Sequence, residues 1–578
     1  MINPKVICKY GGDNMKEKKK GNIIGILIVM AIIIFGVIYG GITLTKNWGK
    51  SKETISKENA TGKLKKICKD ININEVEPRK APIDLGVKDV KDTIPNIDKY
   101  PAKVENTTDS YIEIFSTGEK AGNGKDGWLI DVANNFNESK FEINGKIISV
   151  KVREIASGLG MDYIISEKYL PDAYSPSNEL WGEMIKANGK TIELCDDRMV
   201  GNVAGILISK EKYDELIKKY GAINLKNITQ AVANGEINMG YTNPFASATG
   251  LNFLVSTLAT FDSSNPLSEK AIDGFNEFQN NIPLIAYTTL QLRNSAESGI
   301  LDGFIMEYQT YINSPELKTD YIFTPFGYRH DSPLYSVGNL SNEKKEILNK
   351  FIEFYKQDKY QELAVKDGFN ALEDYKCEIE NLDGNTILQA QKLWKENKNG
   401  DKPIVAVFVA DVSGSMEGEP LNELKKSLLN GSRYIGEENS IGLVTYSNDV
   451  NINLPIEKFD LNQRSLFTGA VQDMDASGGT ATFDAIAVAV QMLLDEKEKN
   501  PDAKLMLFVL SDGETNIGHS LDDLREILES VKIPVHTIGY NANIEALENI
   551  SRINEATSIN ADSDDVIYKL GSLFNAEM

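Results

Sequence analysis

The segment IVAVFVADVSGSM, Ile404–Met416, decides the fold of the C-terminal part of the chain. It begins with seven consecutive apolar residues and ends in a short polar loop that contains an aspartate and two serines. A strand that is apolar at every position is typical of a parallel sheet covered by helices, because both of its faces are then buried. The segment therefore predicts a central strand of an α/β sheet with a polar loop at its carboxyl end.

Similar apolar runs recur further along the chain, and segments with helical spacing of apolar residues separate them. The runs are IGLVTY at 441–446, LMLFVL at 505–510 and PVHTIG at 534–539. The helical segments are 421–435, 483–499 and 521–531. Such alternation predicts a doubly wound, Rossmann-like parallel sheet over residues 402–578.

Polar residues follow three parts of this predicted sheet. Asp411, Ser413 and Ser415 lie in the loop after the first strand, Thr480 lies in SGGTAT, and Asp512 follows the strand LMLFVL. In open α/β sheets the binding crevice lies outside the carboxyl ends of the strands. All five side chains offer hard oxygen atoms, which favours Mg²⁺, Mn²⁺ or Ca²⁺ over zinc or copper. The sequence therefore predicts a divalent metal site.

In their order and spacing these five residues resemble the metal-ion-dependent adhesion site of von Willebrand factor A domains, over residues 402–578. The resemblance implies that Ser413 and Ser415 contact the ion directly, and that Asp411, Thr480 and Asp512 act directly or through water. It favours Mg²⁺ and recognition of an acidic group on a protein partner. The alternative is that DVSGS forms only a turn that caps the following helix.

Residues 110–385 show a second alternation of strands and helices. YIEIFST at 111–117 and IISVKVREI at 147–155 have the pattern of strands. WLIDVANNFNES at 128–139 and LKNITQAVANG at 225–235 have helical spacing. The alternation predicts a second α/β domain.

Four segments of this region resemble type II extracellular solute-binding proteins, the two-lobed receptors of ABC transporters. They are FSTGEK at 115–120, YSPSNELWGEMI at 174–185, GYTNPFASATG at 240–250 and ILDGFIMEYQTYI at 300–312. Hydroxyl groups at helix N-termini can bind an anion together with backbone N–H groups. We therefore expect a small anionic or polar solute, with the candidate contacts Ser116, Thr117, Ser177, Thr242, Ser247 and Glu307. For each hydroxyl residue, helix capping is the alternative.

The N-terminal part contains a long uncharged segment, NIIGILIVMAIIIFGVIYGGITLT at 22–45. Roughly 20 apolar residues suffice to cross a bilayer as a helix. Lys16, Lys18, Lys19 and Lys20 precede the segment and favour a cytoplasmic N-terminus at 1–21 with the bulk of the chain outside the cell. A cleavable signal peptide would have a shorter apolar region with an A-x-A-like site. A buried core helix would have a polar face. The sequence therefore predicts a single-pass membrane helix.

Residues 46–109 are rich in Lys, Glu, Asn and Thr and contain prolines at 78, 82, 95 and 101. This composition predicts a polar stalk. The short apolar alternations ININEV and IDLGV indicate that part of it packs on the next domain.

Composition excludes some classes of partner. The chain has 62 Lys and Arg against 84 Asp and Glu, a formal charge of -22, which would repel nucleic acid over most of its surface. Its four cysteines lie far apart without a CxxC or zinc-knuckle pattern. Three of them, Cys68, Cys195 and Cys377, follow the apolar segment, and no pairing among them is predicted.

Catalysis has little support in the sequence. The only histidines are His330, His519 and His536, and the chain lacks G-x-S-x-G, H-E-x-x-H and phosphate-cradling motifs. We expect a membrane-anchored extracellular binding protein that is not an enzyme. The alternative is a transport receptor whose C-terminal domain is a scaffold. Metal-dependent hydrolysis would need a nucleophile or base that the sequence does not reveal.

Overall fold

The computed structural model describes residues 56–83, 94–282, 284–286, 292, 301–398, 402–513, 515–540, 547, 551, 558–561 and 566–577. The chain divides into two units, Met1–Ser56 and Lys57–Met578, and the second contains almost all of the described residues. The cytoplasmic segment 1–21 and the membrane helix 22–45 that the sequence predicts lie outside them. Among the described residues, none of the helices combines the length and the apolar character that crossing a bilayer requires.

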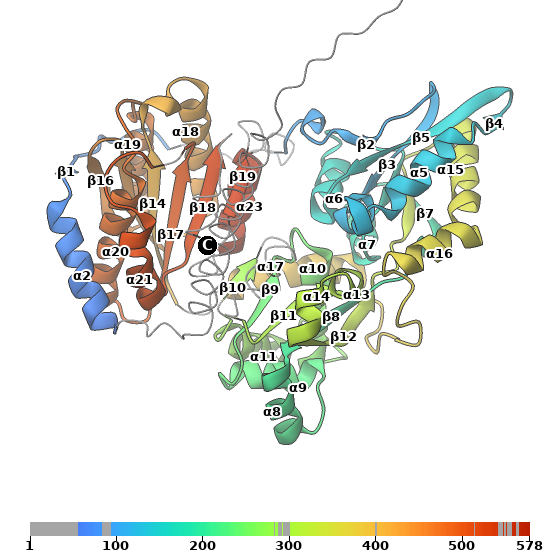
Figure 1. Cartoon of the computed structure of the whole chain (residues 1–578), viewed down its shortest axis with the longest axis horizontal. Helices are drawn as coiled ribbons and strands as arrows, with labels where there is room; N and C mark the ends of the chain where they lie inside the picture. Colours follow the sequence, from blue (N-terminus) through green and yellow to red (C-terminus); the bar gives the residue numbers. More distant parts are fainter. Residues whose placement is uncertain are drawn as a thin grey trace, which may run out of the picture. The chain divides into compact units, whose positions relative to one another are not determined.

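The C-terminal sheet has the strand order β1-β16-β15-β14-β17-β18-β19 (Figure 1). Its strands from 402 onward are β14 (Ile404–Asp411), β15 (Ser440–Tyr446), β16 (Val450–Lys458), β17 (Lys504–Ser511), β18 (Val535–Tyr540) and β19 (Ser558–Ala561). β14 is buried along its whole length and pairs in parallel with β15 and β17. The predicted α/β fold with parallel strands is confirmed. β16 departs from the pattern because it forms an antiparallel pair with β15.

Helices cover both faces of this sheet. Alternate residues of β14, among them Phe408, share a core with α18 (Glu419–Gly431), α19 (Leu461–Gln472) and α23 (Val566–Glu577). Successive side chains of a strand point to opposite faces, so Val407 faces the other side. There, α20 (Thr482–Lys499) packs on β14 and contacts α21 (Leu521–Val531).

The prediction of a polar stalk does not hold for residues 57–83. α2 (Lys57–Asp70) contacts α20 and α21, and β1 (Ile73–Glu75) extends the C-terminal sheet by pairing in parallel with β16. The buried residues Ala60, Leu64 and Ile67 of α2 follow the spacing i, i+4, i+7, which defines one apolar face of a helix. The lysines on the rest of the helix make its composition polar, so composition alone does not reveal this apolar face. ININEV therefore packs on the C-terminal domain, although the sequence predicts contact with the domain that comes next in the chain.

The middle domain contains two further sheets. The first has the order β2-β5-β3-β6-β13-β7, with β4 (Glu142–Ile143) paired to β5. Its strands are β2 (Ala102–Val104), β3 (Ser110–Ser116), β5 (Lys146–Glu154), β6 (Ala173–Ser175), β7 (Ile192–Asp196) and β13 (Leu334–Val337). Its helices are α4 (Gly118–Ala121), α5 (Trp128–Glu138), α6 (Ser157–Ser166), α7 (Leu180–Ala187), α15 (Asn342–Tyr355) and α16 (Asp358–Lys366). The end of the predicted stalk, as β2, is an edge strand of this sheet.

The second sheet has the order β10-β9-β11-β8-β12. Its strands are β8 (Val203–Ser209), β9 (Met239–Thr242), β10 (Leu284–Ala286), β11 (Gly303–Glu307) and β12 (Tyr321–Arg329). The helices are α8 (Lys210–Tyr220), α9 (Leu225–Ala233), α10 (Ala248–Phe261), α11 (Glu269–Gln279), α13 (Tyr308–Ile312), α14 (Pro315–Asp320) and α17 (Gly384–Asn397). The chain leaves the first sheet after β7, builds the second, and returns to the first at β13. Each sheet with its helices is one lobe.

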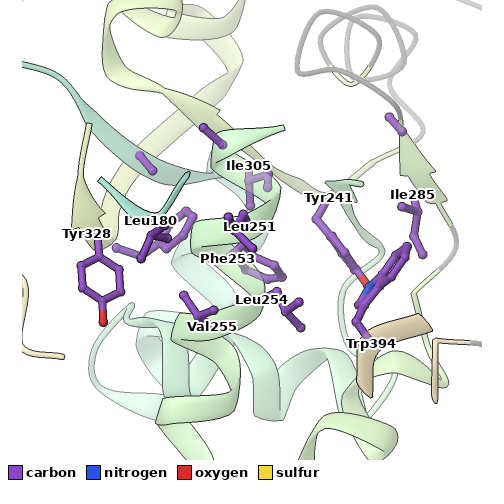
Figure 2. Packing of buried hydrophobic residues seen from close by; sticks show 14 of the residues in the cluster. Leu180, Tyr241, Leu251, Phe253, Leu254, Val255, Ile285, Ile305, Tyr328 and Trp394 are labelled. Carbon is purple, nitrogen blue, oxygen red and sulfur yellow. The ribbon is translucent and has the colours of Figure 1, made fainter. Parts of the chain in front are cut away.

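Helix α10 is the centre of the second lobe. It is buried on nearly all sides, from Ala248 to Ala259, and its polar residues, such as Thr249 and Asn252, form hydrogen bonds with buried partners. Figure 2 shows Leu251 and Phe253 of this helix packed near Ile305. Trp394 of α17 lies beside Tyr241, and its indole N–H donates a hydrogen bond of 2.6 Å to the Tyr241 hydroxyl (Figure 2). The described cysteines Cys68, Cys195 and Cys377 are free thiols.

A buried histidine in the C-terminal sheet makes the stability of that domain depend on pH. His536 of β18 stacks on Phe508 with ring centroids 5.0 Å apart, and burial lowers its pKa to about 3. Below pH 6.5 the unfolded chain takes up a proton that the folded domain does not, so acid destabilises the fold. At about pH 5 the loss should reach about 2 kcal/mol. Urea unfolding followed by hydrogen exchange should show this loss in the wild type and a smaller one in His536→Leu. An equal loss in both proteins would contradict the assignment.

Candidate functional site

The carboxylate of Asp411 is fixed at the carboxyl end of β14. Its Oδ1 accepts a hydrogen bond from the backbone N–H of Ser413 at 2.8 Å. Its Oδ2 accepts from the Ser511 hydroxyl at 2.6 Å and from the Tyr446 hydroxyl at 3.2 Å. Ser511 ends β17 and Tyr446 ends β15, so the two neighbouring strands both hold this side chain. The carboxylate is buried and has one defined orientation.

Ser413, Ser415 and Asp512 form a hydrogen-bonded row beside Asp411. The hydroxyl oxygens of Ser413 and Ser415 lie 3.1 Å apart. The Ser415 hydroxyl donates to Oδ1 of Asp512 at 2.9 Å. Four of the five predicted metal ligands are therefore linked into one group that spans the ends of β14 and β17.

Thr480, the fifth predicted ligand, lies on the loop before α20. This loop packs against the β14 loop, since the Gly414 N–H donates to the Gly478 carbonyl at 3.0 Å. Thr480 is buried, and its N–H donates to Oδ1 of Asn516 at 2.8 Å. Within the described part of the chain, no hydrogen bond joins the Thr480 hydroxyl to the other four residues. The structure thus places Thr480 on the adjacent loop without bonding it to the row.

Two asparagines that the sequence analysis missed hold this loop in place. Oδ1 of Asn448 accepts from the Gly479 N–H at 2.8 Å, and Asn516 accepts from Thr480. Gly478 has φ +80°, and a Cβ there would meet Nδ2 of Asn448 at 2.8 Å, so the position favours glycine. Asn448 follows β15 at the same edge of the sheet as Asp411. Its position after a predicted strand could have identified it from the sequence.

Helix capping does not explain these residues. α18 begins at Glu419 with Gly418 as its N-cap, and the side chain of Ser413 makes no cap hydrogen bond to the short 3₁₀ turn that follows it. α20 begins at Thr482 after Ala481, so Thr480 is not its N-cap. The serines and the threonine are therefore available for another role.

The electrostatics of the row suit a cation. Burial raises the pKa of Asp411 above its usual range, hydrogen bonds from Ser511 and Ser413 oppose the rise, and the negative charge of Asp512 adds to it. A divalent cation would offset both carboxylates. In the described ranges, no group of three or more His, Cys, Asp and Glu side chains could hold a metal ion. The five predicted ligands together have a different composition, two carboxylates and three hydroxyls, which fits a hard ion that keeps water ligands.

The middle domain contains a cavity of about 660 Å³. Of the six predicted solute contacts, Thr117, Ser177, Ser247 and Glu307 line it. Thr242 does not, because its hydroxyl donates to Ser247 Oγ at 2.9 Å. Ser116 is buried and also lies outside the lining. Ser247 accepts from the Gly250 N–H and caps α10, so the capping alternative is correct for this residue.

Glu119, a neighbour of the predicted contacts, also lines this cavity, and the buried Lys120 lies beside it. Glu119 Oε1 accepts hydrogen bonds from the Ser177 hydroxyl, at 2.5 Å, and from the Thr117 hydroxyl. Lys120 is fully buried and donates to Thr117 Oγ1 at 2.8 Å. Burial would raise the pKa of Glu119, but Lys120, Ser177 and Thr117 together hold it below its usual range. Burial lowers the pKa of Lys120, and Glu119 and Glu307 oppose this.

Comparisons with known proteins identify both domains. Residues 406–574 match the family model of the von Willebrand factor type A domain, and residues 121–370 match that of bacterial extracellular solute-binding protein. Inter-alpha-trypsin inhibitor heavy chain H3 of Bos taurus is 30% identical over 179 residues, which are 28% of this chain and 20% of that protein. This chain thus spans only about a fifth of that relative's length.

Similar solved structures exist for each part. A von Willebrand factor type A structure from Catenulispora acidiphila is 18% identical and covers 30% of this chain and 42% of its own, with a TM-score of 0.28. The sulfate-binding protein SubI from Mycobacterium tuberculosis H37Rv is 15% identical and covers 46% of this chain and 87% of its own, with a TM-score of 0.33.

Proposed function

Because the chain joins a bacterial extracellular solute-binding domain to a C-terminal von Willebrand factor A domain, we propose that it is a membrane-anchored extracellular binding protein. Its C-terminal domain holds a divalent cation and recognises an acidic group on a protein partner. The observation that carries this proposal is the hydrogen-bonded row of Ser413, Ser415 and Asp512 beside the fixed carboxylate of Asp411.

The five proposed ligands contribute to holding the ion in different ways. Ser413 and Ser415 present hydroxyl oxygens, and Ser415 donates to Asp512, accepts from Ser413 and retains one lone pair. Asp411, Asp512 and Thr480 act directly or through water. The bound cation, Mg²⁺ in our proposal with Mn²⁺ or Ca²⁺ as substitutes, supplies a positive charge with an exchangeable position. Two carboxylates and three neutral hydroxyls leave room for one carboxylate from a partner.

We infer recognition rather than catalysis from the surroundings of the three histidines. His519 is paired with Asp484 at 2.7 Å between Nδ1 and Oδ1. His330 lies between two asparagine amides, and His536 is buried in the sheet. None of the three contacts the row at Asp411 in the described residues, so the row has no adjacent histidine base.

The anchor completes the proposal. A membrane helix at 22–45 after a lysine-rich N-terminus would place residues 46–578 outside the cell. A second candidate function, a transport receptor whose C-terminal domain is a scaffold, is favoured by the cavity of about 660 Å³, which has the size of a small-molecule site.

One experiment tests anchoring, exposure and metal dependence together. Intact cells that produce the full chain should bind a fluorescent glutamate-rich peptide in Mg²⁺ and should lose it when a chelator is added. Deletion of residues 22–45 should move the binding activity away from the membrane fraction. A matched peptide with glutamine in place of glutamate is the control. Binding that persists in chelator, or that is equal for the two peptides, would refute the proposal.

A further inference from the structure

Two of the predicted hydroxyl donors of the cavity in the middle domain, Thr117 and Ser177, are already in use. Thr117 and Ser177 both donate to Glu119, and Lys120 donates to Thr117. An incoming oxyanion would have to displace the Glu119 carboxylate, which holds the position that the sequence assigns to an anionic guest. The Glu119 carboxylate therefore already occupies the position of an anion in this cavity.

The floor of the cavity has more carboxylates than cations. Glu307 is buried, and 17% of the Glu119 side chain is exposed. The one buried ammonium beside them is Lys120, whose Nζ lies 3.5 Å from Glu119 Oε1 and which also interacts electrostatically with Glu307. If both carboxylates are ionised, this group has a net charge of -1.

His330 does not supply the missing positive charge. Oδ1 of Asn252 accepts from the Tyr328 N–H at 2.8 Å and its Nδ2 donates to the Tyr328 carbonyl at 2.7 Å, which fixes the orientation of the amide. The same Nδ2 lies 3.1 Å from Nε2 of His330, so Nε2 accepts a hydrogen bond from this amide.

The other ring nitrogen of His330 does not make a hydrogen bond to Glu307 either. His330 is almost fully buried, its Nδ1 has no hydrogen-bond partner among the described residues, and it lies 3.5 Å from Glu307 Oε1. The Thr249 hydroxyl donates to Glu307. Among the described residues, no cation is therefore in hydrogen-bond contact with Glu307.

At the rim of the cavity, the positive and negative charges balance each other. Lys103 pairs with Glu154 at 2.9 Å, and the other charged rim residues, Lys99 and Asp126, have opposite signs. Tyr100 also lines the cavity. The excess of negative charge is therefore confined to the floor, next to Glu307.

We propose that this cavity binds a small organic solute that carries a positively charged nitrogen, which pairs with Glu307. The proposal rests on the solute-binding function given above as the second candidate, and it narrows the anionic or polar guest expected from the sequence to a cationic one. A cavity of about 660 Å³ holds an amine-bearing metabolite of moderate size rather than a bare ion.

Thermal unfolding of the full chain in detergent, at constant Mg²⁺, tests the charge of the guest. The cationic probes are choline, ethanolamine and spermidine, and the anionic probes are sulfate, phosphate and molybdate. We expect at least one cationic probe to raise the unfolding midpoint of the middle domain by about 5 °C near saturation, and the anionic probes to leave it unchanged.

Variants separate the contributions of the two carboxylates. Glu307→Gln should lose the response to cations and should unfold at a higher temperature without ligand, because it removes an uncompensated buried charge. Glu316→Gln, an exposed change in the same lobe, is the matched control and should alter neither value. Glu119→Ala should gain a response to anions, since it frees Thr117, Ser177 and Lys120.

The outcomes distinguish this inference from the function on which it rests. Stabilisation of the wild type by anions alone would overturn the proposed charge of the guest and keep the solute-binding function. No shift with any of the six probes would overturn both. An unchanged cation response in Glu307→Gln would remove Glu307 as the pairing residue.

Discussion

Replacing Asp411 with asparagine should abolish Mg²⁺ binding by the C-terminal domain and leave its sheet folded. The substitution removes one of the two carboxylates of the site, so the affinity should fall by more than the roughly 10–100-fold that changes beside a metal ligand cause. Folding should survive, because the hydroxyls of Ser511 and Tyr446 can accept hydrogen bonds from an amide as well as donate them to a carboxylate. Calorimetric titration of the full chain with Mg²⁺ measures the loss.

Two further variants serve as a control and as a test of a residue that positions Asp411. Asp475→Asn changes an exposed carboxylate near the Thr480 loop and should bind Mg²⁺ like the wild type. Tyr446→Phe removes one of the three hydrogen bonds to Asp411 and should cost about 10-fold in affinity, as expected for a residue that positions a ligand. Wild-type affinity in Asp411→Asn would show that the row of hydroxyls and carboxylates is not the metal site.

Much of the C-terminal fold could be predicted because its signals are local. β14, β17 and β18 coincide with apolar runs, and the predicted ligands lie where those runs end. The antiparallel strand β16 was not predicted, although VNINLPIEK begins with the apolar and polar alternation of a half-buried strand, in which Val450 and Leu454 are buried. The pairing of β1 with β16 joins Ile73 to Val450, and nothing in either segment identifies a partner so distant in sequence.

The middle site shows a different limit of sequence reasoning. Thr117 and Ser177 line the cavity, but the sequence reasoning assumed that their hydroxyl donors were free. The helix that follows Thr117 has only four residues, so no periodicity indicates on which side Glu119 and Lys120 lie. Only the three-dimensional contacts reveal that the Glu119 carboxylate accepts the hydrogen bonds of these donors. For this reason we expect a positively charged guest.

Replacing Leu64 with alanine should destabilise the C-terminal domain by about 2–5 kcal/mol, although Leu64 lies more than 300 residues before that domain in the sequence. Leu64 is fully buried in α2, which contacts α20 and α21. The adjoining segment is bonded to the same domain, since Arg79 pairs with Asp473 at 2.9 Å. Such a cost is a large share of the stability of a typical domain.

The control for this prediction lies two residues away on the same helix. Lys66 is exposed, so Lys66→Ala should change stability by no more than about 0.5 kcal/mol. Hydrogen exchange in urea is measured on peptides from β14 and β17 of the full chain. It reports the stability of the C-terminal domain separately from that of the middle domain. This separation is needed because a chain with several domains does not unfold in one step. If residues 57–83 were only a stalk, both variants would leave that exchange unchanged. A loss confined to Leu64→Ala would instead show that the segment 57–83 is a structural part of the C-terminal domain, so that a fragment beginning at 402 would lack the helix that contacts α20 and α21.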